Sequence, residues 1–544
     1  MLIPRKYQED IYNTCKDNNT LVILPTGLGK TLVALMLAKD MLKDNPKSKI
    51  VFLAPTKPLA EQHLEYFKEH LDSRTKGLQL FTGKINAVKR KALWKTSRII
   101  FSTPQCIEND LKKENYNLKS VCLLVEDECH RCLKNYSYTY VAQKYLEQAK
   151  KQRILGLTAS PGVEEEKIKL ILSNLNMERI ELRTRNSPDV IPYLQDLDSN
   201  KIDVEFPARF EEIRRIIKVM FDVRVAELRA MGLLLGATMK TSILMEQKRI
   251  SATLKSDPNQ RHLYWAMSLC AQCIRLDHSL ELLETQSLLT FKDFIDDTFT
   301  QALAQKTKAV QVIAKLPEFL ELNDILTRLL NEGMEHPKMD KILNVIQHQR
   351  EKNPDFKAIV FSQFRTSAGA IAKYLNSKDI PASVFVGQSK KTTTFGQSGS
   401  NQKEQQQIVV DFKEGRTKVL CATSIAEEGL DIPEVNAVIF FEPIPSAIRT
   451  IQRTGRTARL MKGSLYILVC KGTRDEAYYY ASKKKELKMY ESIEKISDDL
   501  KSGRLTLASL KEPEETTSVM VEPTDVNVEP TGVNVDSSKW TSVV

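Results

Sequence analysis

In the N-terminal part of the chain, short apolar runs alternate with longer amphipathic stretches. The runs have the length and continuous hydrophobicity of strands that are buried on both faces of a parallel sheet. Each run is followed by a polar loop and then by a helical pattern, so the sequence predicts repeated βα units and a doubly wound sheet. The predicted strands are residues 21–24, 50–54, 99–102, 121–125 and 154–158.

A second series of the same kind begins near His336. Its apolar runs again alternate with helical patterns, which predicts a second α/β domain of similar size. The fold class is therefore α/β, with two doubly wound parallel-sheet domains at residues 1–205 and 336–490. The predicted strands of the second domain are residues 358–362, 382–386, 419–422, 438–441 and 464–470.

Strand patterns disappear between the two series, over residues 206–335. Long stretches there, such as residues 209–235, show the spacing of amphipathic helices and few helix breakers. We therefore predict an all-helical insertion domain. The remaining segments are predicted to be a C-terminal helix at 491–511 and a disordered tail at 512–544, which is poor in Lys and Arg and rich in Pro, Thr and Val.

The composition is that of an ordinary soluble protein, with 42% hydrophobic and 27% charged residues. No apolar run approaches the roughly 18 residues that cross a bilayer, and the start of the chain lacks the apolar segment of a secretory signal. We expect a cytoplasmic protein without a membrane partner. The net charge of +11 fits a polyanionic partner, although an excess of Lys also serves solubility.

Nine cysteines are scattered along the chain. Cys129 and Cys132, and Cys270 and Cys273, have the CxxC spacing of zinc ligands, but the two pairs are much farther apart than in a zinc ribbon. We expect reduced, buried thiols and no structural zinc.

A phosphate-binding loop is predicted between the first strand and the helix that follows it. Backbone N–H groups freed by Gly27 and Gly29 can cradle phosphates, helped by the positive end of the helix. Lys30 would reach the β- and γ-phosphates, and the hydroxyl of Thr31 would bind Mg²⁺. Leu24 stands where the usual pattern has its first glycine, and a turn that only caps a helix is the alternative. The loop predicted to hold ATP is Pro25, Thr26, Gly27, Leu28, Gly29, Lys30 and Thr31.

The run 121–125 ends in the acidic sequence Glu126, Asp127, Glu128. Carboxylates at the C-terminal end of a parallel strand lie beside the phosphate-binding loop in this topology. Asp127 would hold Mg²⁺, and Glu128 would polarise the attacking water as general base. A solvated acidic loop is the alternative.

Residues 452–459, QRTGRTAR, lie in the second α/β domain. Arg456 and Arg459, three residues apart on a helix, could together meet a γ-phosphate as arginine fingers do, and Gln452 would belong to the same catalytic site. The alternative is a basic helix surface. If the segment faces the first domain, the two domains form one composite ATP site.

These three motifs, in this order, resemble those of helicase superfamily 2 of the DExH type. The resemblance implies RecA-like domains and nucleic-acid-dependent hydrolysis of ATP, with ATP and Mg²⁺ as cofactors. Residues 5–8 resemble the adenine-reading Q motif, which implies that Arg5 and Gln8 contact the nucleotide. Residues 158–162 resemble motif III, which couples hydrolysis to domain motion. In a match to motif V, Gly429 and Asp431 would contact the nucleotide.

The same resemblance implies contacts with the nucleic-acid backbone in motifs Ia, Ib, IV and V. The first two motifs lie in the first domain and the other two in the second. The residues expected to make these contacts are Pro55, Thr56, Lys57, Thr103, Pro104, Gln363, Arg365 and Thr423.

A closer resemblance, over about residues 1–490, is to the helicase half of archaeal Hef, a family related to the Fanconi anaemia group M helicases. It rests on residues 386–388, 402–405, 423–433 and 442–449. It implies an ATP-dependent DNA helicase or translocase that remodels forked or branched DNA in replication-fork repair, at the nucleoid. The helical insertion takes the place of the extra domain that Hef-like proteins carry for branched DNA.

Two features depart from the Hef pattern. Glu126 replaces the apolar or aromatic residue usual before the Asp-Glu pair, and this third carboxylate would either raise a neighbouring pKa or strengthen the attraction for Mg²⁺. No Glu-Arg-Lys-x-x-x-Asp motif of an XPF-type nuclease is present. We therefore expect no strand cleavage, and a separate nuclease acting in trans is a conjectured partner.

Two other functions remain open at this level. RIG-I-like and Dicer helicases share the core and an insertion at this place, so a double-stranded-RNA-stimulated ATPase is the first alternative. The second is a catalytically silent nucleic-acid-binding scaffold. The intact Lys30, Asp127, Glu128, Arg456 and Arg459 speak against it.

Overall fold

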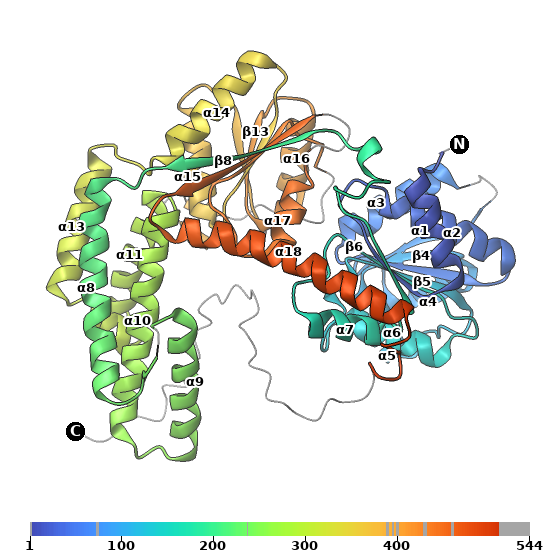
Figure 1. Ribbon diagram of the computed structural model, residues 1–544, viewed down its shortest axis with the longest axis horizontal. Helices are drawn as coiled ribbons and strands as arrows, with labels where there is room; N and C mark the ends of the chain where they lie inside the picture. Colours follow the sequence, from blue (N-terminus) through green and yellow to red (C-terminus); the bar gives the residue numbers. More distant parts are fainter. Residues whose placement is uncertain are drawn as a thin grey trace.

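The computed structural model describes residues 3–71, 75–236, 238–387, 391–393, 396–398, 402–427, 432–457 and 462–510. Figure 1 shows two α/β lobes, a helical arm beside the second lobe, and one long helix that runs from the second lobe to the first. The predicted fold class, two parallel-sheet domains with a helical insertion between them, is confirmed. Within these residues no helix is both long and apolar enough to span a membrane.

The first lobe is a seven-stranded parallel sheet with helices on both faces, and each face has its own apolar core. Its strands are β1 (Thr20–Ile23), β2 (Lys49–Leu53), β3 (Leu78–Phe81), β4 (Ile99–Ser102), β5 (Val121–Asp127), β6 (Ile154–Thr158) and β7 (Arg179–Leu182), in the order β3-β4-β2-β5-β6-β1-β7. Its helices are α1 (Lys6–Asp17), α2 (Lys30–Asp44), α3 (Lys57–His70), α4 (Ala87–Thr96), α5 (Pro104–Lys112), α6 (Ser137–Gln148) and α7 (Glu165–Asn174). Only β3 and β7, the half-buried edge strands, lack the continuous apolar run that predicted the other five.

The second lobe is built in the same way on a six-stranded parallel sheet. Its strands are β8 (Leu197–Val204), β9 (Ala358–Phe361), β10 (Ala382–Phe385), β13 (Val419–Ala422), β14 (Ala437–Phe440) and β15 (Gly463–Cys470), in the order β10-β13-β9-β14-β15-β8. Its helices are α14 (Lys338–Lys352), α15 (Arg365–Asn376), α16 (Gln402–Lys413) and α17 (Ala447–Thr454). A small hairpin, β11 (Lys391–Thr393) and β12 (Gly396–Ser398), precedes α16.

Strand β8 belongs to the second sheet although it precedes the helical arm in the chain. It pairs in parallel with β15 along its whole length. The boundary predicted at residue 205 would place this strand in the first domain, whereas the pairing divides the two lobes before Leu197. The predicted boundary misplaces β8 because its sequence, LDSNKIDV, is polar and half exposed, as an edge strand can be. Without a continuous apolar run, the sequence does not show which sheet the strand joins.

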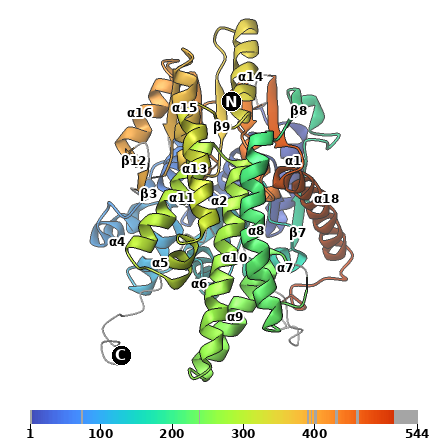
Figure 2. The ribbon, with the colours of Figure 1, turned by 90° about the vertical axis from the view of Figure 1, so that its left-hand side faces the viewer.

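The helical arm comprises α8 (Ala208–Ala230), α9 (Lys240–Ser256), α10 (Arg261–Thr285), α11 (Leu288–Leu303), α12 (Lys308–Ile313) and α13 (Pro317–Asn331). Helix α10 packs against α8 and α9, and α13 packs against α8 (Figure 2). Two apolar clusters hold these helices together, and Cys270 and Cys273 lie in the cluster next to α9. All nine thiols of the chain are free and buried.

Buried polar contacts fasten the arm to the second lobe. The side-chain oxygen of Gln286, after α10, accepts a hydrogen bond from Ser367 Oγ at 2.9 Å. Lys338 at the start of α14 donates to the Thr285 carbonyl at 2.9 Å and pairs with Asp475 at 2.5 Å, with both side chains fully buried. The ion pair lies within the second lobe, whereas the two hydrogen bonds cross to the arm. Since losing a buried hydrogen bond leaves polar groups unsatisfied and is costly, we expect the arm and the second lobe to move together.

Helix α18 (Arg474–Lys501) links the two lobes. The boundary predicted at residue 490 falls inside it. Its last turns lie on the first lobe, where four apolar side chains at helical spacing join the core formed by α7 and β7 (Figure 1). These side chains are Met489, Ile493, Ile496 and Leu500.

Candidate nucleotide-binding site between the lobes

The loop between β1 and α2 has the backbone expected of a phosphate cradle. Gly27 and Gly29 have φ of 87° and 88°, the left-handed region that favours glycine. A Cβ at Gly29 would also lie 2.2 Å from Gln8 Nε2, so any other residue there would displace the amide of Gln8. Lys30 is the first residue of α2, and its ammonium donates to the Leu24 carbonyl at 2.9 Å. Thr31 follows it in the first turn.

Helix α1 holds this loop from the side. Gln8 is buried, donates from Nε2 to the Leu28 carbonyl at 3.0 Å, and accepts from the Arg5 amide at 2.8 Å. The Tyr7 hydroxyl donates to the same carbonyl at 2.8 Å. The Arg5 guanidinium lies over the Tyr193 ring, 5.1 Å from its centre. Arg5 and Gln8 therefore lie at the loop, and their contact with adenine stays a prediction.

Asp127 ends β5 on the side of the phosphate loop. Its Oδ2 lies 2.8 Å from Nε2 of His63, a buried side chain of α3. Burial by itself would raise the pKa of Asp127, but His63 and Lys30 outweigh it and hold that pKa below its ordinary value. The carboxylate is therefore ionised. With the hydroxyl of Thr31 it offers the hard oxygen donors that suit Mg²⁺.

Glu128 follows with a left-handed backbone, φ 53° and ψ 45°, which is uncommon for a residue with a side chain. Its Oε2 is buried, lies 3.3 Å from His130 Nδ1 and makes no hydrogen bond. His130 Nδ1 lies 3.1 Å from the Thr158 hydroxyl, which accepts from the Ser160 amide at 3.1 Å. This chain of contacts joins the acidic motif to the segment that resembles motif III.

Glu126 points to the opposite face of the sheet, because successive side chains of a strand alternate. It is fully buried against Cys129, Cys132 and Tyr138, and this burial raises its pKa well above the ordinary value. Burial therefore favours the neutral form of this carboxyl. Of the two effects considered for Glu126, the stronger attraction for Mg²⁺ does not fit a side chain on the face away from the phosphate loop. The pKa values of Cys129 and Cys132 are raised mainly by burial and further by Glu126.

The arginine-rich segment of the second lobe meets the phosphate loop of the first. A Cβ at Gly455 would lie 2.8 Å from Thr26 Cβ, so the backbone of Gly455 packs against the Thr26 side chain. Arg456, the next residue, is buried and donates to the Glu427 carbonyl at 2.6 Å. Gln452 is buried on α17. The predicted contacts Arg459, Gly429 and Asp431 lie outside the described residues.

Arg453 is a structural residue, unlike the predicted arginine fingers Arg456 and Arg459. It is fully buried, pairs with Glu427 at 2.7 Å and lies over the rings of Phe361 and Phe440. Arg449 contacts the same carboxylate at 3.2 Å. Glu427 thus organises the segment. The sequence does not reveal this role, because an acidic pair such as Glu427 and Glu428 is usually solvated.

The contact between Gly455 and Thr26 can be tested by substitution of the glycine. Gly455→Ala should push the lobes apart, because 2.8 Å between carbon atoms is too close, and reduce ATP turnover by about 10²-fold, the scale of a misplacement of about 1 Å. The backbone itself tolerates alanine, since φ is −64°. Steady-state ATPase at saturating nucleic acid measures the effect. Gly83→Ala, where nothing lies within 4 Å of the added Cβ, is the control, and unchanged turnover in Gly455→Ala would contradict this interface.

The residues expected to grip nucleic acid lie where strands end and helices begin. Parallel strands present these ends along one edge of each sheet, and helix N-termini favour phosphates. Thr56 Oγ1 is buried without a hydrogen-bond partner. The predicted residues follow β2 (Pro55, Thr56, Lys57), β4 (Thr103, Pro104), β9 (Gln363, Arg365) and β13 (Thr423). The amide of Gln363 donates to Glu442, a carboxyl whose pKa burial raises to about 7.

Three family models match successive parts of the chain. They are the DEAD/DEAH box helicase over residues 5–168, a helical bundle of ATP-dependent RNA helicases over 209–333, and the helicase conserved C-terminal domain over 337–461. The chain is similar to the crystal structure of the Hef helicase domain of Pyrococcus furiosus, with 40% identity and a TM-score of 0.66. The match covers 88% of this chain and 98% of that one.

Two relatives show the same pattern over most of the chain. A helicase of Methanocaldococcus jannaschii, whose name gives RNA as its substrate, is 34% identical over 487 residues, 89% of this chain and 60% of that protein. The DNA helicase Fancm of Drosophila melanogaster is 32% identical over 501 residues, 87% of this chain and 33% of that protein. The chain thus spans 60% or less of either relative.

Proposed function

The chain belongs to helicase superfamily 2 as a Hef-type helicase domain, a nucleic-acid-dependent ATPase, and on that premise we propose that it translocates on DNA and remodels forked or branched DNA in replication-fork repair. The observation that carries the proposal is the contact of Gly455 with Thr26 across the two lobes. A nucleotide held there touches both lobes, so its binding and hydrolysis change their spacing. Each lobe carries its own set of predicted phosphate contacts, so a change in spacing moves one grip relative to the other.

Each residue of the site has a distinct proposed role in hydrolysis. Lys30 and the freed amides of the loop bind the phosphates, and Thr31 and Asp127 would hold Mg²⁺, which neutralises phosphate charge when bound. Glu128 orients the attacking water and takes up its proton. Arg456, with Arg459, compensates the charge that develops on the γ-phosphate.

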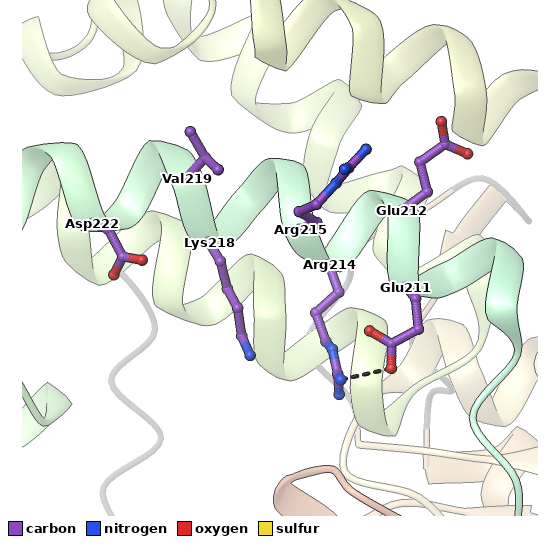
Figure 3. A pocket seen from close by; sticks show the side chains of 7 residues that line it. All are labelled: Glu211, Glu212, Arg214, Arg215, Lys218, Val219 and Asp222. Carbon is purple, nitrogen blue, oxygen red and sulfur yellow. Dashed lines mark ion pairs between the residues drawn. The ribbon is translucent and has the colours of Figure 1, made fainter.

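The helical arm is the proposed source of preference for branched DNA. Several cations of the arm form ion pairs within it: Arg209 with Glu332, Arg214 with Glu211, Lys240 with Glu281 and Arg249 with Glu246. A shallow depression of about 660 Å³ lies along α8, and Figure 3 shows the side chains that line it. Three acidic and three basic side chains line it, so this face is not positive overall: Glu211, Glu212 and Asp222, and Arg214, Arg215 and Lys218.

Helix α9 is a better candidate for phosphate contact. Lys248 and Lys255 are exposed, and within the described residues neither forms an ion pair. Replacing both with alanine should weaken binding to a fork more than to a single strand. The salt slope of fork binding should become shallower by about 0.9 per lost phosphate contact.

Fluorescence anisotropy at several salt concentrations measures this change. Lys306→Ala with Lys315→Ala, which removes the same charge from another part of the arm, is the matched control. An equal loss on both DNAs would make the arm a general grip, and no loss would make α9 structural.

One assay tests the proposed function. Steady-state ATPase is compared on a fork, a Holliday junction, duplex DNA, single-stranded DNA and duplex RNA. We expect the strongest stimulation by the branched DNAs. Stimulation by duplex RNA alone would favour the alternative that the name of the M. jannaschii relative suggests, and turnover without any dependence on nucleic acid would overturn the proposal.

A further inference from the structure

His63 connects two parts of the first lobe that belong to different motifs, helix α3 and the acidic end of β5. It lies on α3, whose first residues are the proposed nucleic-acid contacts, and its Nε2 is 2.8 Å from Oδ2 of Asp127. Both side chains are only 8% exposed. None of the motifs identified in the sequence includes His63. A histidine within the apolar stripe of a helix is usually a core residue.

The direction of this hydrogen bond follows from the charge of its acceptor. A carboxylate that holds a metal ion is ionised, and an ionised carboxylate only accepts hydrogen bonds. Nε2 of His63 must therefore carry the proton and donate it. The imidazole cannot turn away easily, because its ring lies 4.4 Å from the Phe52 ring of β2. One oxygen of Asp127 is thus held by α3.

Nucleic acid is proposed to bind at the N-terminus of α3, about two turns before His63. Thr56 is its N-cap residue and has a buried hydroxyl without a hydrogen-bond partner. Lys57, the first residue of the helix, pairs with Glu61 at 2.8 Å, a contact that a phosphate could replace. From Lys57 to His63 the helix rises by only about 9 Å, so a shift of the helix at its start is transmitted to the carboxylate.

We propose that His63 is a positioning residue that couples nucleic-acid binding at the start of α3 to the metal-holding carboxylate Asp127. The inference rests on the proposed function, because it takes the start of α3 as a nucleic-acid contact. When nucleic acid seats on Thr56 and Lys57, α3 takes one position, and the hydrogen bond from His63 sets the orientation of Asp127. Without the hydrogen bond from His63, the orientation of the Asp127 carboxylate no longer depends on nucleic acid.

The test uses two variants that differ only in the donor. His63→Leu removes the N–H and keeps an apolar side chain of similar size, whereas His63→Gln places an amide N–H near the position of Nε2. His70→Gln is the control, since His70 lies on the same helix, contacts the Tyr66 carbonyl and stacks on its ring. The readouts are the affinity for a fluorescent ADP analogue as Mg²⁺ is titrated, with and without saturating fork DNA, and the ATPase stimulation by that DNA.

In the wild type, fork DNA should shift the Mg²⁺ midpoint of nucleotide binding. His63→Leu should lose this shift and lower the stimulation ratio by about ten-fold, the equivalent of one hydrogen bond to a charged group, with fork affinity retained. His63→Gln should recover most of both, and His70→Gln should match the wild type. A wild-type shift in His63→Leu overturns the inference, as does an equal loss of turnover with and without DNA. If the wild type itself does not respond to DNA, the proposed function fails instead.

Discussion

Glu128→Gln is expected to bind Mg·ATP normally and to hydrolyse it about 10²- to 10⁴-fold more slowly, the usual contribution of a general base. The amide keeps the shape of the side chain but cannot take up a proton. Oε2 of Glu128 makes no hydrogen bond in the structure, so taking up a proton from the attacking water would break none. Retained nucleotide affinity with lost turnover separates this role from that of Lys30, whose replacement by alanine should weaken ATP binding itself.

The neighbouring Glu126 provides a matched control. Burial raises the pKa of its carboxyl well above the ordinary value and so favours the neutral form. Glu126→Gln is then nearly isosteric and isoelectronic with the native residue, and turnover should change by less than about three-fold, the scale of a modest local adjustment. Single-turnover hydrolysis and fluorescent-nucleotide binding measure both variants. Near-normal turnover in Glu128→Gln would remove it from the role of general base.

Arg456→Ala should reduce hydrolysis by about 10³- to 10⁵-fold, the usual range for an arginine finger, with little change in DNA affinity. Arg456 directly follows Gly455, which touches Thr26 of the phosphate loop, so its backbone lies close to the predicted nucleotide site. In the structure it donates to the Glu427 carbonyl. We expect it to exchange this partner for the γ-phosphate when ATP is bound.

Two other arginines of the same segment distinguish this role from stability. Arg449→Ala, which removes another contact with Glu427 but lies at the far end of α17, should retain most of the turnover. Arg453→Ala should instead destabilise the second lobe by about 3–5 kcal/mol, because it leaves Glu427 without its buried partner. ATPase rate, DNA affinity and thermal unfolding are measured for all three. Loss of DNA affinity with intact turnover in Arg456→Ala would make the segment a nucleic-acid surface.

The sequence by itself determined the two α/β domains, the helical insertion and the order of the ATP-site motifs. Local rules suffice for these features. A strand buried on both faces needs a continuous apolar run, as at Ile154–Thr158, and a phosphate loop needs left-handed backbone that glycine adopts most readily, as at Gly27 and Gly29. The sequence also predicts that Glu126 and Asp127, as neighbours on β5, face opposite sides of the sheet. It does not predict which of the two faces the phosphate loop.

Only the tertiary structure decided which distant segments meet. Edge strand β8 joined the second sheet through backbone hydrogen bonds, which any sequence can make. Helix α18 docks on the first lobe through an apolar stripe that could have faced any core. The contacts of His63 with Asp127, and of Gly455 with Thr26, join residues far apart in the chain. No local preference encodes such pairs, because their energy comes from burial and complementarity that exist only once the elements have packed together.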